Sequence, residues 1–138
     1  MGRILAIDYG QKRAGIAVTD PLQLVANGLT TVHVKDIWSF LSTYITTESV
    51  DCIVVGEPRT MQNQPSDAAR FIDPFVVKLK KTFPDMKIVR VDERFTSKMA
   101  HDTMLSAGLS KTQRRNKELV DTISATLILQ SYMNTTIH

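Results

Sequence analysis

The chain has 138 residues, of which 43% are hydrophobic and 22% are charged, and this composition is typical of one globular domain. It has no apolar run of the roughly 20 residues that a membrane span needs, and its single cysteine, Cys52, excludes a disulfide framework and a cysteine-based metal site. The formal net charge is +3, and twelve of the 17 Lys and Arg residues follow residue 69. This uneven distribution favours an anionic partner. Solvated helix faces explain the same asymmetry.

Five strands and four helices are predicted from the spacing of apolar residues. The predicted strands cover residues 3–9, 14–20, part of 24–34, 51–56 and 86–92. The predicted helices cover residues 36–48, a segment from about 66 to 83, another from about 96 to 108, and about 117–133. The first two strands are separated only by "GQKR" and are expected to form a hairpin.

The order of these elements, βββαβαβαα, predicts an α/β fold with a mixed sheet and helices on both faces. No linker or repeat interrupts the chain, so residues 1–138 are expected to form a single domain. A strand pattern begins at Arg3, so we expect no signal peptide, no membrane association and a location in the cytoplasm.

Two helix caps and one helix face are predicted in more detail. Asp36 and Asn116 are the candidate N-caps of the first and last helices. In the last helix the predicted buried stripe is bordered by Asp121, which can therefore face the sheet edge. The stripe consists of Val120, Ile123, Leu127 and Ile128.

Acidic residues fall at the ends of four of these elements. Asp8 lies near the end of the first strand, Glu57 follows the fourth, Asp92 and Glu93 end the fifth, and Asp121 lies about one turn into the last helix. Because ligands of open α/β sheets bind outside the carboxyl ends of the strands, these acids are expected to converge. The alternative is that they cap helices or form turns, which is a common role for Asp.

Clustered carboxylates indicate a particular chemistry. They resist ionisation unless a cation binds between them. Mg²⁺ prefers oxygen ligands and uses a few carboxylates together with water and substrate phosphates. Two ions about 3.5–4 Å apart can stabilise both the attacking and the leaving oxygen of a phosphoryl displacement. The acids therefore predict Mg²⁺ or Mn²⁺ as cofactor, with two ions as the expected number.

Four segments carry a resemblance that extends over nearly the whole chain. They are "ILAIDYGQKRAGIAV", "VVGEP", "VDERFTS" and "KELVDTISATLIL", and together they resemble the YqgF family. That family is related to the RuvC junction resolvases, and its members have been described as Holliday junction resolvases and as nucleases that mature the 5′ end of pre-16S ribosomal RNA. The resemblance implies a ribonuclease H-like fold with a five-stranded sheet in the order 3-2-1-4-5.

The resemblance also implies site residues. Asp8 in "DYG", Glu93 in "DER" and Asp121 in "VDTISA" correspond to a catalytic, metal-binding acidic triad. Gly10 and Gly15 would serve the turn and close packing.

This sequence departs from the family at Glu57. The family usually has Gly-Leu-Pro where this chain has Gly56-Glu57-Pro58, and the loop that follows has no glycine. Glu57 is therefore a possible fourth metal ligand, or a residue paired with Arg59.

Basic residues lie beside these acids in the sequence. Phosphate contacts are the functional interpretation, since Lys and Arg provide sequence-independent affinity for nucleic acid, and ordinary surface charge is the alternative. The candidate nucleic-acid-binding residues are Lys12, Arg13, Arg94, Arg114, Arg115 and Lys117. Tyr9 is the only aromatic residue next to the site, and it can equally belong to the core.

The leading hypothesis is a metal-dependent nuclease, a hydrolase that acts on structured nucleic acid. Processing of the 5′ end of pre-16S rRNA ranks first and resolution of four-way DNA junctions second, because a resolvase is usually a dimer and the sequence offers no clear dimer interface. A monomer or weak homodimer is expected, and endo- and exonucleolytic cleavage stay equally open.

Two other classes of function compete with a nuclease. Sugar kinases and actin-like ATPases share the fold, but they clamp nucleotide between two such domains. A module that binds nucleic acid without cutting it is disfavoured, because carboxylates without a cation would repel phosphate.

Overall fold

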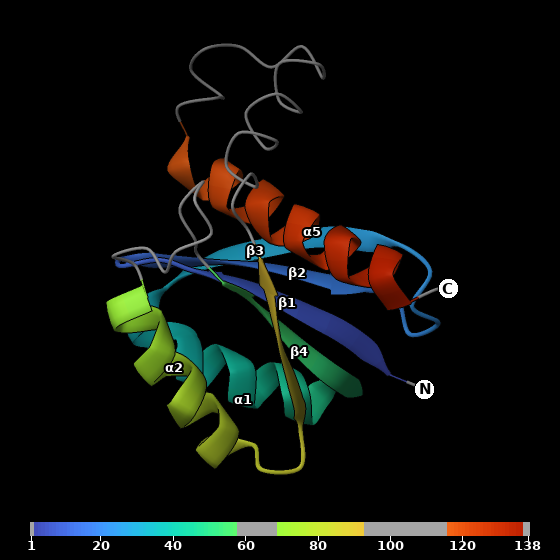
Figure 1. The fold of residues 1–138 in the computed structure, drawn as a ribbon, viewed down its shortest axis with the longest axis horizontal. Helices are drawn as coiled ribbons and strands as arrows, with labels where there is room; N and C mark the ends of the chain where they lie inside the picture. Colours follow the sequence, from blue (N-terminus) through green and yellow to red (C-terminus); the bar gives the residue numbers. More distant parts are fainter. Residues whose placement is uncertain (1, 58–68, 93–115, 137–138) are drawn as a thin grey trace.

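The computed structural model of the chain describes residues 2–57, 69–92 and 116–136 (Figure 1). The strands are β1 (Arg3–Tyr9), β2 (Arg13–Thr19), β3 (Ala26–His33), β4 (Val50–Glu57) and β5 (Lys87–Asp92). The helices are the short 3-10 helix η1 (Val34–Asp36), α1 (Ile37–Thr47), α2 (Ala69–Thr82) and α5 (Lys117–Thr136). All five predicted strands are confirmed, and the helix predicted at about 96–108 lies outside the described residues. Within the described ranges, no helix has the length and apolar character needed to cross a membrane.

The strands form one sheet in the order β3-β2-β1-β4-β5. β1 pairs antiparallel with β2, and β2 with β3, which confirms the predicted hairpin. β1 pairs parallel with β4, and β4 with β5. The predicted mixed sheet in the order 3-2-1-4-5 is therefore confirmed, and the carboxyl ends of β1, β4 and β5 lie at one edge.

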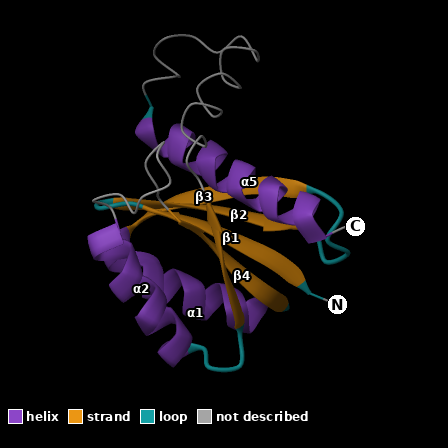
Figure 2. Cartoon of the chain, in the orientation of Figure 1, coloured by secondary structure: helices purple, strands orange, loops and turns teal. Residues whose placement is uncertain are grey.

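Helices cover both faces of the sheet, as predicted (Figure 2). Successive side chains of a strand point to opposite faces. Leu5 and Ile7 of β1 therefore pack with α1 and α2, whereas Ile4 and Ala6 pack with α5. Cys52 lies on the α5 face and is buried, as expected of a small core residue.

The buried stripe of α5 differs from the prediction. Of the four residues predicted, only Ile128 is fully buried, while the other three are partly exposed. The prediction failed because apolar residues occur around most of this helix, so the sequence does not single out one face. The buried apolar residues are Ala125, Ile128, Leu129, Tyr132 and Met133. Asp121 lies one turn before Ala125, and it therefore extends this stripe instead of bordering it.

The two predicted helix caps have different outcomes. Asn116 caps α5, because its Oδ1 accepts hydrogen bonds from the backbone N–H groups of Glu118 and Leu119 at 3.0 and 3.3 Å. The predicted side-chain cap by Asp36 is wrong, since its side chain makes no such bond. The chain enters α1 through η1, so the backbone of Asp36 is already helical, and His33 Nδ1 accepts from Lys35 N instead.

Candidate active site

A glycine on β2 brings the regions of Asp8 and Asp121 together. Asp8 and Gly15 are direct partners in the antiparallel register of β1 and β2, and such partners project toward the same face of a sheet. A Cβ atom at Gly15 would overlap the backbone carbonyl of Asp121. Only glycine therefore allows α5 to approach β2 this closely, and Asp8 and Asp121 lie on the same face at the carboxyl end of β1.

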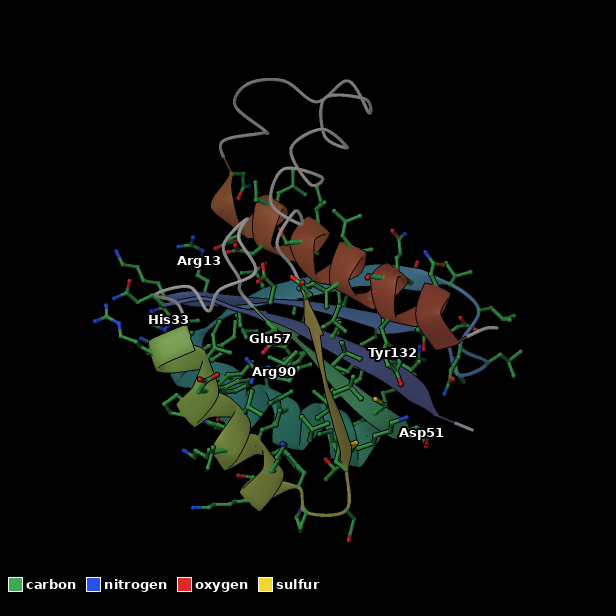
Figure 3. All side chains as sticks on the ribbon, in the orientation of Figure 1. Arg13, His33, Asp51, Glu57, Arg90 and Tyr132 are labelled. Carbon is green, nitrogen blue, oxygen red and sulfur yellow. The ribbon has the colours of Figure 1, made fainter. Side chains whose placement is uncertain are left out.

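An ion pair between Arg13 of β2 and Asp121 of α5 also connects these two elements. The Arg13 Nε donates to Asp121 Oδ2 at 2.9 Å, and the two side chains are 29% and 23% exposed. Figure 3 shows Arg13 beside the first half of α5, whereas Tyr132 and Asp51 lie toward the other end of the sheet. The sequence predicted Arg13 as a phosphate ligand, and the structure adds an acidic partner from a segment 108 residues away.

A hollow of about 260 Å³ opens beside this ion pair, lined by Gly10, Gln11, Lys12, Arg13 and Asp121. The turn between β1 and β2 is compact, because Gly10 N donates to Arg13 O at 2.8 Å. Lys12 and Arg13 therefore bring two cations to a hollow that also has a carboxylate in its wall. Sequence reasoning missed Gln11, which carries no charge and is placed here only by the shape of the turn.

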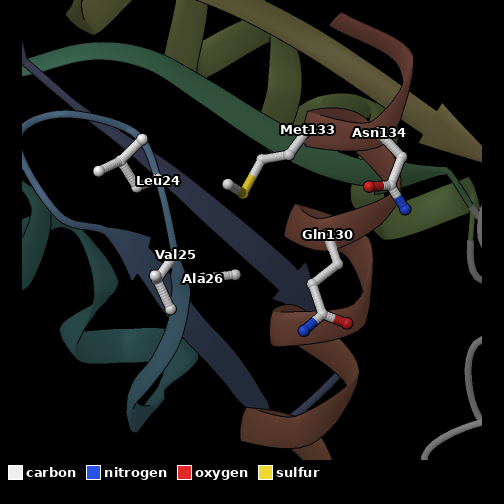
Figure 4. A pocket seen from close by; sticks show the side chains of 6 residues that line it. All are labelled: Leu24, Val25, Ala26, Gln130, Met133 and Asn134. Atoms are coloured by element: carbon white, nitrogen blue, oxygen red, sulfur yellow. The ribbon is translucent and has the colours of Figure 1, made fainter. Parts of the chain in front are cut away.

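Two larger hollows lie away from these residues. One, of about 320 Å³, is formed by Leu24, Val25 and Ala26 and the end of α5, and its lining carries no charged side chain (Figure 4). The other, of about 500 Å³, lies at the amino ends of β4 and β5 and includes Asp51 and Asp85. Neither lining contains a cation that could neutralise phosphate. The hollow lined by Lys12, Arg13 and Asp121 carries cations and lies at the carboxyl end of β1, and it is therefore favoured as the site.

Glu57 and Asp92 are partners in the β4–β5 register at the same edge of the sheet. Side chains two residues apart in a strand point to the same face of the sheet, so Glu57 points to the face of Val55, which is covered by α1 and α2. Asp8 continues the series of Ala6, which faces α5. The alternation thus assigns Glu57 and Asp8 to opposite faces, and the role of Glu57 as a fourth ligand stays a prediction.

Tyr9 is partly buried and packs against the core on the face opposite Asp8. Its ring stacks on that of Phe75, with centroids 4.0 Å apart and an interplanar angle of 13°. Burial raises the pKa of the Tyr9 hydroxyl. The interpretation of Tyr9 as a core residue is therefore confirmed.

The other predicted residues are placed only in part. Lys12 is exposed, and Lys117 is the first residue of α5. Glu93 follows the last residue of β5 in the sequence, and together with Arg94, Arg114 and Arg115 it lies outside the described residues. Glu93 as third member of the triad stays a prediction.

The donors at this site fit a hard divalent cation. Mg²⁺ commonly binds through one or two carboxylates and completes its coordination with water and substrate phosphates. Asp8 and Asp121 are carboxylates on one face of the sheet, and Asp121 lines a hollow with room for a phosphate group. Within the described ranges, no group of three or more His, Cys, Asp or Glu residues is placed to hold a metal ion, and the role of Asp8 and Asp121 as metal ligands stays a prediction.

The chain is similar to proteins of known families over almost its full length. The model of the RuvX family, described as Holliday junction resolvase, matches residues 2–135. A Flavobacterium johnsoniae protein named "Putative pre-16S rRNA nuclease" is 56% identical over 134 residues, which is 97% of each chain. Proteins of the same name from Bacteroides fragilis and Porphyromonas gingivalis are 56% and 53% identical and cover 98% and 97% of each chain.

One solved structure supports the fold. The structure of T. thermophilus RuvC in complex with a Holliday junction substrate matches with a TM-score of 0.59, over 99% of this chain and 97% of that one. Sequence identity is 15%, so this likeness concerns the ribonuclease H-like fold alone. The matching family model, together with relatives that are more than half identical to this chain, shows that the chain belongs to the RuvX family. This is the YqgF family that the four sequence motifs indicated.

Proposed function

We propose that this protein is a metal-dependent nuclease that hydrolyses phosphodiester bonds in structured nucleic acid, with the 5′ end of pre-16S rRNA as its substrate. The observation that supports the proposal is the approach of α5 to β2 at Gly15, which brings Asp121 to the sheet face of Asp8. Asp121 also lines a hollow together with Lys12 and Arg13. The names of the relatives more than half identical to this chain favour RNA as the substrate.

The residues of the site have distinct roles in this proposal. Asp8 and Asp121, with Glu93 as the third acid, hold Mg²⁺ or Mn²⁺. Such ions, when bound, supply Lewis-acid activation of the phosphodiester and a reactive water at neutral pH. Lys12 and Arg13 neutralise the phosphates beside the scissile bond and fix the strand over the acids, without reading its sequence.

A second candidate substrate is the four-way DNA junction, which the description of the matching family model favours. Cutting such a junction symmetrically requires two active sites, so it needs a dimer. Cleavage of rRNA needs only one site, which agrees with a cytoplasmic monomer or weak homodimer.

The test is cleavage of a pre-16S rRNA fragment and of a four-way DNA junction by the purified protein, with Mg²⁺ and with Mn²⁺. Asp8→Asn should lower the rate about 1,000-fold, because metal-ion catalysis supplies several kcal/mol of the barrier and each 1.36 kcal/mol is worth a factor of ten. The matched control is Asp36→Asn, since Asp36 is an exposed aspartate on a different element.

The outcomes separate the possibilities. Cleavage of the RNA fragment that is lost in Asp8→Asn and kept in Asp36→Asn supports the proposal. Cleavage of the junction alone would move the substrate to DNA. A folded protein that cleaves neither substrate with either metal would refute the proposal.

A further inference from the structure

In the proposed nuclease, the Arg13 side chain can bind either a phosphate group of the nucleic acid or the carboxylate of Asp121. The inference drawn from this rests on the proposed function. The position of Arg13 in the hollow suits a phosphate group. Its Nε is nevertheless bound to Asp121 Oδ2 at 2.9 Å. Asp121 is one of the acids proposed to hold the metal ion, so the guanidinium bonds the carboxylate that the ion would use.

The geometry leaves Arg13 able to change partner. A guanidinium has five N–H donors in a planar fork that matches carboxylate and phosphate oxygens equally well. Within the described part of the chain, the bond to Asp121 is the one hydrogen bond that the Arg13 side chain makes. The side chain is 29% exposed and lines the hollow, so its terminal nitrogens can reach a phosphate group there.

A divalent ion and this guanidinium compete for Asp121. Both are cations, and each is attracted to the same carboxylate while repelling the other at short range. An ion that arrives without nucleic acid must bind beside Arg13 or displace it. A phosphate group in the hollow offers the guanidinium a second anion, and charge-assisted bonds of this kind are strong.

We propose that Arg13 is a positioning residue that couples metal binding to nucleic-acid binding. Without nucleic acid, Arg13 holds Asp121 and weakens the binding of the divalent ion. When a phosphate group enters the hollow, Arg13 moves to it, and its guanidinium no longer competes with the ion for Asp121 Oδ2. The two ligands then bind with positive cooperativity, and linkage requires that each raise the affinity of the other by the same factor.

The experiment measures metal affinity and not turnover. Mn²⁺ is titrated calorimetrically into the metal-free protein, first alone and then with a saturating pre-16S rRNA fragment that carries phosphorothioate linkages. Arg13→Gln should bind Mn²⁺ about five-fold more tightly than the wild type without RNA, since it removes a partly exposed ion pair and a nearby positive charge. The tightening of Mn²⁺ binding by RNA should be smaller in Arg13→Gln than in the wild type.

Arg3→Gln is the matched control, because it removes the same charge from a partly buried arginine on β1. Arg3 pairs with Glu48 at 3.8 Å, at the end of the sheet away from the hollow, and this change should leave Mn²⁺ affinity at the wild-type value. Arg13→Lys keeps the charge but lacks the Nε donor. It should shift Mn²⁺ affinity in the same direction by a smaller factor, and it provides the test if Arg13→Gln does not fold.

Asp8→Asn locates the bound ion and separates the two proposals. If Mn²⁺ binding to the wild type is lost in Asp8→Asn, but the Arg13 variants bind Mn²⁺ as the wild type does or more weakly, the coupling role is wrong and the nuclease proposal stands. If the wild type binds no Mn²⁺ at an Asp8-dependent site, with or without RNA, the metal-dependent function fails and the coupling fails with it.

Discussion

Asp8 on β1 lies directly across the hairpin register from Gly15 on β2, and the Gly15 position is in contact with the backbone of α5 at Asp121. Two acids that are far apart in the sequence thus share one face of the sheet because a side chain is missing between them. The geometry of the candidate site therefore depends on a residue that supplies no chemistry of its own.

Replacing Gly15 by Ala should damage both the fold and the site. The added Cβ would overlap the Asp121 carbonyl, which is main chain and cannot rotate away. Overpacking of this kind costs about 1–3 kcal/mol of unfolding free energy. Urea unfolding should show this loss, and calorimetry should show weaker Mn²⁺ binding because α5 is pushed away from β1.

Gly28→Ala is the matched control for this prediction. A Cβ at Gly28 would meet the end of the Thr122 side chain at 2.7 Å, and a side chain can turn aside. The loss of stability should therefore be smaller than in Gly15→Ala. Equal stability of Gly15→Ala and the wild type would show that α5 does not approach β2 this closely in solution.

The sequence predicted the sheet well because its signals are local. The strands are short apolar runs bounded by turn residues, and the hairpin is joined by a single short turn. The strand order was not available from these local patterns and came from the resemblance to the YqgF family. Asp8 and Asp121 could be selected because they lie near the end of a strand and near the start of a helix, which is a property visible along the chain.

Contacts between distant segments could not be predicted in the same way. The ion pair of Arg13 with Asp121 joins residues 108 positions apart, and nothing in either neighbourhood specifies the partner. The buried face of α5 was misjudged because this helix has apolar residues on several sides. Ala125 and Leu129 became core through their contact with the sheet, which the helix sequence by itself does not encode.

Asn116→Ala should lower the unfolding free energy by about 1 kcal/mol, the usual cost of losing an N-cap. Its Oδ1 accepts hydrogen bonds from two backbone N–H groups that would otherwise lack a helical partner. Asn116→Asp should keep most of the stability, because Asp caps equally well. Asn134→Ala, at an exposed position near the other end of α5, is the control in urea unfolding. Equal midpoints for the two alanine variants would contradict the capping role.

The stability of the protein should fall in acid partly through Asp20. Backbone N–H groups, first that of Val25 and then that of Leu24, hold the pKa of Asp20 below its ordinary value of 3.8. The unfolded chain therefore binds the proton more readily than the folded one. The contribution of Asp20 is present above the unfolded pKa and is lost as the pH falls through the folded pKa.

Urea midpoints measured between about pH 6 and pH 2.5 check this dependence, because the window spans the ordinary pKa of an aspartate. The wild type should lose stability more steeply than Asp20→Asn below about pH 4, where the carboxylate takes up its proton. The hydrogen bonds at stake are those from Leu24 N and Val25 N to Asp20 Oδ1, both 2.8 Å long. Parallel curves for the two proteins would show that these bonds do not depend on the charge of Asp20.

Removal of divalent metal should abolish cleavage and leave the fold nearly unchanged. Leu5, Ile53 and the other residues of the two cores pack through apolar contacts on either face of the sheet, away from the acids at its edge. Treatment with EDTA should therefore stop hydrolysis while the thermal midpoint falls by only a few degrees, about the effect of 1 kcal/mol in a domain of this size. Mg²⁺ or Mn²⁺ should restore the rate in the wild type but not in Asp8→Asn. Full activity in EDTA would require a nucleophile and a general base other than metal-activated water, and the acids at this edge would then have to act by proton transfer alone.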